Sequence, residues 1–85
     1  MLVVNDILKI VKLDIRGKVC PITFVYTKLN LEKMNKGEIL EITLDFPPAL
    51  ENVPTSCKRQ NIGELLEIIE NDTIEKTWLL KIKKI

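Results

Sequence analysis

A cysteine directly followed by a proline is the feature of this chain best suited to chemistry. Cys20 and Pro21 come shortly after Gly17, which itself follows an alternating apolar stretch over residues 10–15. Alternation predicts a strand and glycine a turn. Proline predicts a helix start, because its missing N–H would have no partner in the first helical turn. Cys20 is therefore expected at or near a helix N-cap, where the helix dipole and free N–H groups favour the nucleophilic thiolate.

Charged residues lie close to Cys20 in the sequence. Arg16 and Lys18 could add positive potential beside a thiolate, whereas Asp14 would oppose them. Pairing between Asp14 and Arg16, or anchoring of the strand end, is the favoured role for those two residues. Gly17 is expected to supply the turn between strand and helix.

The composition predicts one small domain over residues 1–85, in which residues 1–9 form an N-terminal arm. The chain has 46% hydrophobic residues, a net charge of +1, two cysteines and no histidine. Balanced charge argues against nucleic acid, and we expect no DNA partner. Two cysteines without histidine fit neither a disulfide framework nor a four-ligand zinc site, so we expect no metal and no cofactor. Without a leader or a long apolar run, we expect a cytoplasmic protein with no membrane contact.

Apolar periodicity and breaker residues predict a βαβαββ order. The strands are expected over residues 9–15, 38–44, 64–69 and 77–85, and the helices over residues 21–35 and 55–60, the second helix beginning near Pro54. Residues 64–69 also fit a helix, but the turn-rich segment before residues 77–85 favours a hairpin. The short first crossover makes the first two strands parallel. The expected fold is a two-layer α/β sandwich with both helices on one face of a four-stranded mixed sheet.

The first predicted helix carries two apolar stripes. One is expected to face the core and contains Phe24, Thr27, Leu31 and Met34. The second stripe contains Ile22, Val25, Tyr26 and Leu29. The favoured interpretation is that it belongs to the same broad buried face; the alternative is a surface for docking a partner. Trp78 is expected in the core, as is Cys57, for which packing is favoured over a role as a resolving thiol. The lysines at 81, 83 and 84 are expected on a solvated strand face.

The motifs of the chain resemble those of the TusA/SirA family of small sulfur-carrier proteins. The family pattern is Leu-Asp-x-Arg-Gly at a strand end, followed by Cys-Pro-x-Pro at the start of the first helix. This chain has Leu13-Asp14-Ile15-Arg16-Gly17 and Cys20-Pro21-Ile22-Thr23. The similarity continues through Gly37-Glu38-Ile39-Leu40, through Asp45, Pro47 and Ala49, and through Val53-Pro54. It spans about residues 12–85.

The resemblance implies a carrier that holds sulfane sulfur as a persulfide on Cys20, supported by Arg16, Gly17, Lys18 and Pro21. It also implies a cysteine desulfurase or another sulfurtransferase as donor, and a downstream acceptor protein, for example in tRNA thiolation. Whether such a persulfide carrier of sulfurtransferase type counts as an enzyme is left open. The family fold is a two-layer α/β sandwich, in agreement with the pattern-based prediction.

Three positions depart from the family pattern. Thr23 replaces the second motif proline and is expected to permit the helix while loosening its start. Asn61 replaces a glycine, which asparagine can do in the left-handed region. Ile62 lies where many relatives carry histidine, so no imidazole can assist the sulfur.

Two alternatives remain open at the level of sequence. A thiol–disulfide redox protein would use Cys20 and Cys57, and their Cα atoms would have to lie within about 7 Å. A non-catalytic regulatory or RNA-binding module on the same fold would show salt-dependent affinity for RNA.

Overall fold

The computed structural model describes residues 9–85, and the part of the expected N-terminal arm at residues 1–8 lies outside this range. The elements are β1 (Ile10–Asp14), α1 (Ile22–Lys33), β2 (Ile39–Leu44), α2 (Ala49–Arg59), β3 (Gly63–Asp72) and β4 (Thr77–Lys84). This is the predicted βαβαββ order, and residues 64–69 form a strand as expected.

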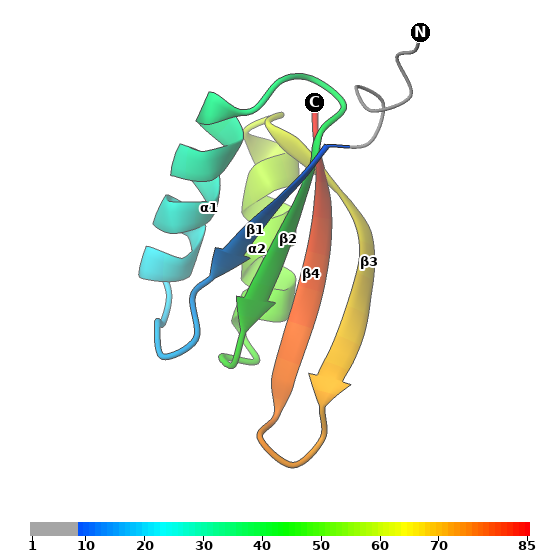
Figure 1. Ribbon diagram of the computed structural model, residues 1–85. Helices are drawn as coiled ribbons and strands as arrows, with labels where there is room; N and C mark the ends of the chain where they lie inside the picture. The colour runs from blue at the N-terminus through cyan, green and yellow to red at the C-terminus, as the bar shows by residue number, and fades with distance from the viewer. Residues whose placement is uncertain (1–8) are drawn as a thin grey trace, which may run out of the picture.

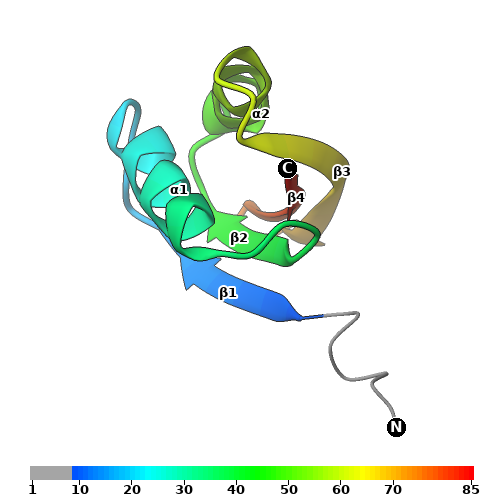
Figure 2. The same cartoon turned by 90° about the horizontal axis from the view of Figure 1, so that it is seen from above.

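The four strands make one mixed sheet in the order β1-β2-β4-β3. β1 and β2 are parallel, and β4 pairs antiparallel with both β2 and β3. Figure 1 shows the strands fanning out, and the view from above in Figure 2 shows α1 and α2 side by side on one face of the sheet. The predicted two-layer α/β sandwich is therefore confirmed.

The core lies between the helices and the sheet, and strand alternation explains its composition. Every second residue of β2 and β4 points to the helices, as the period of two in a strand requires. Together with residues of the helices and of the adjoining loops, they form a buried core of Ile15, Leu31, Met34, Leu40, Ile42, Leu44, Ala49, Val53, Cys57, Leu80 and Ile82. Phe24 and Trp78 pack against this cluster and are half-buried.

The open face of the sheet carries the charged residues. Lys81 on β4 lies between Glu41 of β2 and Glu67 of β3, with N–O distances of 3.8 and 3.4 Å. Lys81 thus belongs to an ion-pair network across three strands. Lys83, two residues further on, is exposed on the same face.

α2 begins earlier than the sequence predicted. The expected start was near Pro54, but the helix begins at Ala49 with Pro48 as its N-cap, and Pro54 lies inside it. A proline there forgoes one helical hydrogen bond. The spacing of four between Ala49, Val53 and Cys57 places all three on the buried side of the helix. Burial of that stripe offsets the missing bond.

α1 also differs from expectation on one side. Its fully buried residues are Thr23, Thr27 and Leu31, while the second apolar stripe is 40 to 48% exposed at Ile22, Val25, Tyr26 and Leu29. The prediction of one broad buried face was wrong. The two helices form a single layer, so within residues 9–85 no third element covers the flank of α1 that faces away from the core (Figure 2).

Candidate functional site

Cys20 lies in the loop between β1 and α1, immediately before the helix. Pro21 is the N-cap residue of α1, so Cys20 precedes the cap by one position. The peptide bond between Cys20 and Pro21 is cis. The Thr23 N–H donates to the Val19 carbonyl at 3.2 Å, which closes the turn around the cysteine. Cys20 is a free, half-buried thiol.

Within residues 9–85, two side chains make hydrogen-bond contacts with the sulfur of Cys20. The Thr23 hydroxyl oxygen lies 3.3 Å from Sγ, and the Asn52 amide nitrogen donates to Sγ at 3.5 Å. Thr23 is fully buried on the first turn of α1, whereas Asn52 is an exposed residue of α2. Both contacts come from side chains, not from the free backbone N–H groups that the N-cap prediction invoked.

A groove of about 220 Å³ opens beside the sulfur. Its α1 side is formed by Cys20, Pro21 and Phe24. Its α2 side is polar and consists of Asn52, Thr55, Ser56 and Arg59. The groove gives a group bonded to Cys20 both space and hydrogen-bonding partners, with a cationic residue on its wall.

Of the predicted supporting residues, Pro21 lines the groove beside Cys20, whereas Arg16, Gly17 and Lys18 make their contacts elsewhere. The Arg16 guanidinium donates to both carboxylate oxygens of Asp14, at 2.7 Å for the shortest contact. Its hydrogen bonds hold the pKa of Asp14 below the usual range. Gly17 adopts a positive φ of 84°, as a turn glycine should, and its N–H donates to Asp45 at 2.9 Å. The expected Asp14–Arg16 pair is thus present.

Lys18 contacts an aromatic ring. Its amino group lies 5.8 Å from the ring centroid of Tyr26 on α1, within the range of a cation–π interaction. Arg16 and Lys18 both line a shallow recess at the end of the sheet, together with Asp45 and Glu75, and Cys20 is not among its residues. The sulfur itself is contacted by other side chains.

Cys57 is a core residue, as expected. Its side chain is fully buried on α2, and this burial raises the pKa of its thiol to about 11. A thiol with so high a pKa is protonated at neutral pH and is a poor nucleophile. Its environment is unsuited to thiol exchange with Cys20.

Alkylation should therefore separate the two cysteines. In the native protein at neutral pH, iodoacetamide is expected to modify Cys20 and leave Cys57 unmodified, because only the former is accessible. Modification of Cys57 is expected after denaturation, which exposes its side chain. Peptide mass spectrometry measures both sites. Equal labelling of the two cysteines in folded protein at neutral pH would contradict this assignment.

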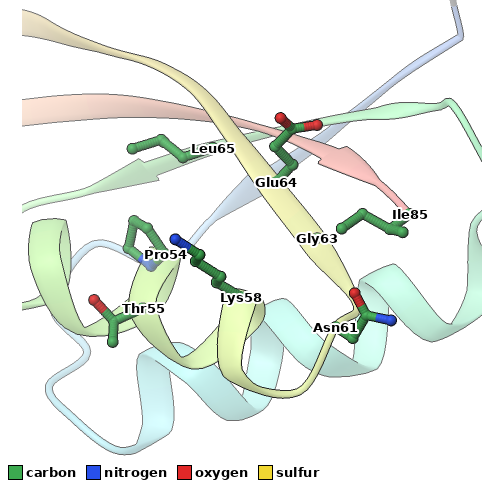
Figure 3. A pocket seen from close by; sticks show the side chains of 8 residues that line it. All are labelled: Pro54, Thr55, Lys58, Asn61, Gly63, Glu64, Leu65 and Ile85. Carbon is green, nitrogen blue, oxygen red and sulfur yellow. The ribbon is translucent and has the colours of Figure 1, made fainter.

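A larger recess, of about 490 Å³, lies between α2 and the start of β3. Figure 3 shows Pro54, Thr55 and Lys58 of α2 on one side and Leu65 of β3 on the other, with Glu64 pointing away from α2. It contains no thiol and shares only Thr55 with the groove at Cys20. Cys20 and its groove are therefore the better candidate site.

The sequence identifies Cys20 as the candidate residue but does not predict the side chains around it. The sequence indicates Thr23 only as the replacement of a motif proline, whereas in the structure its hydroxyl oxygen lies 3.3 Å from the Cys20 sulfur. Asn52, Thr55, Ser56 and Arg59 reach the site through the packing of α2 against α1. No local signal near Cys20 indicates that packing.

The fold and the Cys-Pro helix start define a small α/β protein with one accessible thiol just before its first helix. A family model described as "Sulfurtransferase TusA" matches residues 11–84. The chain belongs to this family, as its motifs indicated.

Individual relatives agree with this assignment. A candidate sulfur carrier protein of Archaeoglobus fulgidus is 47% identical over 72 residues, which cover 85% of this chain and 78% of the relative. One of Thermotoga maritima is 42% identical, covering 84% and 89%. The candidate sulfur carrier YedF of Escherichia coli K12 is 34% identical, covering 72% and 77%.

A solved structure shares the fold. The SirA-like protein of Desulfitobacterium hafniense superimposes with a TM-score of 0.72 over 86% of this chain and 95% of its own, at 20% identity. Within residues 9–85, neither helix has the length and apolarity needed to span a membrane.

Proposed function

We propose that this protein is a sulfur carrier that holds sulfane sulfur as a persulfide on Cys20. The observation that carries the proposal is the accessible Cys20 thiol before Pro21 and α1, in a chain that matches the TusA family from residue 11 to 84. The names of its relatives support the same role.

Loading is a displacement on sulfur. The Cys20 thiolate attacks the outer sulfur of a donor persulfide; the new S–S bond forms to Cys20, and the donor's own S–S bond breaks. The donor cysteine leaves as a thiolate, so no external oxidant or reductant is needed. In delivery, an acceptor thiolate attacks the same outer sulfur and Cys20 leaves as the thiolate. The groove beside Cys20 offers the outer sulfur room between α1 and α2.

Donor and acceptor are expected to be proteins. A cysteine desulfurase or another sulfurtransferase would supply the sulfur, and a protein of a thiolation pathway would receive it. Exposed apolar residues that precede Cys20 or lie along α1 are suited to such contacts: Val19, Ile22, Val25, Tyr26 and Leu29. We place this activity in the cytoplasm and in a single domain, and we propose that it needs neither a cofactor nor a metal. The proposal includes supporting roles for Arg16, Gly17, Lys18 and Pro21.

Loading by a cysteine desulfurase tests the proposal. After incubation with the desulfurase, its coenzyme and cysteine, the intact protein should gain the mass of one sulfur atom. Dithiothreitol should remove this mass, because a thiol reduces a persulfide. Protein that stays at its original mass while the desulfurase turns over, and that also fails to load from inorganic polysulfide, would refute the proposal.

A further inference from the structure

Thr23 occupies the position of the second proline in the family motif. A proline has no hydroxyl, so only chains with a hydroxyl residue at this position can make this contact with the Cys20 sulfur. Thr23 is fully buried, and its hydroxyl oxygen lies 3.3 Å from the Cys20 sulfur. Asn52 reaches the same sulfur from α2, with its amide nitrogen at 3.5 Å. A hydroxyl and a side-chain amide can both donate hydrogen bonds to an anionic sulfur.

We propose that the Thr23 hydroxyl and the Asn52 amide donate hydrogen bonds to Cys20 Sγ and stabilise it as the leaving thiolate when its sulfur is handed on. This inference rests on the proposed carrier function and adds which residues favour delivery. In the loaded state Cys20 Sγ is the inner, nearly uncharged atom of a persulfide. As the outer sulfur departs, negative charge develops on Sγ.

Hydrogen bonds to sulfur strengthen as this charge develops. Hydrogen bonds to ionised groups are roughly twice as strong as neutral ones. The two donors therefore stabilise the transition state of release more than the loaded ground state, which is the condition for a faster reaction. A better leaving thiolate also departs faster in exchange at sulfur.

Loading responds differently to the same donors. Hydrogen bonds to an attacking thiolate in general favour its formation but lower its intrinsic nucleophilicity, and these two effects oppose each other. Removing the donors is thus expected to slow release strongly and to change loading little. Thr23 and Asn52 bias the carrier toward giving up its sulfur.

The test uses small reagents, so it does not depend on the identity of donor or acceptor. Inorganic polysulfide loads Cys20 with one sulfur and leaves a polysulfide shorter by one atom. Cyanide then attacks the outer sulfur: the S–S bond breaks, a C–S bond forms, and the products are thiocyanate and the Cys20 thiolate. Thiocyanate formation gives the release rate, and intact mass gives the extent of loading.

Thr23→Val and Asn52→Ala are each expected to slow release about tenfold, as the loss of one hydrogen bond to a charged sulfur predicts. The double variant should be slower than either single variant, but the two effects are not expected to multiply, because both side chains contact the same sulfur. Thr23→Ser retains the hydroxyl and should release at the wild-type rate. Thr27→Val is the matched control, because the Thr27 hydroxyl donates to the Thr23 carbonyl at 2.9 Å and not to the sulfur. Asn30→Ala is the control for Asn52, since its amide donates to the Tyr26 carbonyl.

Two results would overturn the inference while leaving the carrier function intact. One is wild-type release rates in fully loaded Thr23→Val and Asn52→Ala. The other is Thr23→Ser as slow as Thr23→Val, because shape and not the hydroxyl would then be responsible. Failure of every protein to load, wild type included, would refute the carrier function and this inference with it.

Discussion

Replacing Cys20 with serine is expected to reduce sulfur loading from complete to undetectable. A serine hydroxyl stays protonated at neutral pH and cannot hold sulfane sulfur in an S–S bond. The side chain at this position is half-buried beside Thr23 and Asn52, and serine makes a smaller, uncharged replacement there. The fold should survive, since Cys20 only packs against the edge of the core. Intact mass after incubation with polysulfide or a desulfurase measures the loss.

Cys57→Ala is the matched control for this experiment. It removes the other thiol, which is fully buried and whose pKa burial raises to about 11, and it should leave loading at the wild-type extent. Loading of folded Cys20→Ser would contradict the assignment. Loss of sulfur loading in folded Cys57→Ala would also contradict the assignment, because the sulfur would then reside on Cys57 or require this residue.

The largest effect on stability is expected at Gly63, the first residue of β3. A Cβ atom there would lie 2.7 Å from Cγ2 of Ile82 and 3.2 Å from Cδ1 of Leu31. Both neighbours are fully buried, and Cγ2 is a branch close to the backbone that cannot swing aside. Gly63→Val should therefore lower the free energy of unfolding by about 3 kcal/mol, as overpacking of a core does.

Urea unfolding followed by circular dichroism measures this change. Glu64→Val introduces the same side chain at the next, exposed position of β3 and should alter stability by only about 0.5 kcal/mol. The prediction fails if both variants unfold at the wild-type midpoint. It also fails if Glu64→Val is the more damaging of the two, since the close approach at Gly63 would then not matter.

The fold could largely be predicted because its signals are local. The alternation in β2 sets which residues face the helices, and a turn with a glycine of positive φ separates β1 from α1. Asn61 likewise adopts a positive φ of 58°, as its replacement of a glycine suggested. The start of α2 was mispredicted because Pro54 is a start signal by itself. The helix continues through Pro54 because Ala49, Val53 and Cys57 form a buried stripe along it, which is seen only in the structure.

Only the part of the site with local sequence signals could be predicted. Cys20 is marked by adjacent residues, so the sequence identifies it. Asn52 lies 32 residues away in the sequence and reaches the sulfur only when α2 packs beside α1. Thr23 was interpreted as a weaker helix start, yet it is fully buried and its hydroxyl contacts the thiol. A substitution that seemed to weaken the motif supplies one of two contacts to the sulfur.

The most direct test of the carrier role follows one sulfur atom through a complete cycle. Wild-type protein is loaded with radiolabelled sulfur from a cysteine desulfurase, separated from the donor, and mixed with an excess of a low-molecular-weight thiol or with cyanide. We predict one labelled sulfur per chain, bound at Cys20, its complete transfer to the acceptor, and return of the protein to its original mass and to full capacity for reloading. Label that never binds Cys20, or that binds and cannot be passed on, would contradict the account.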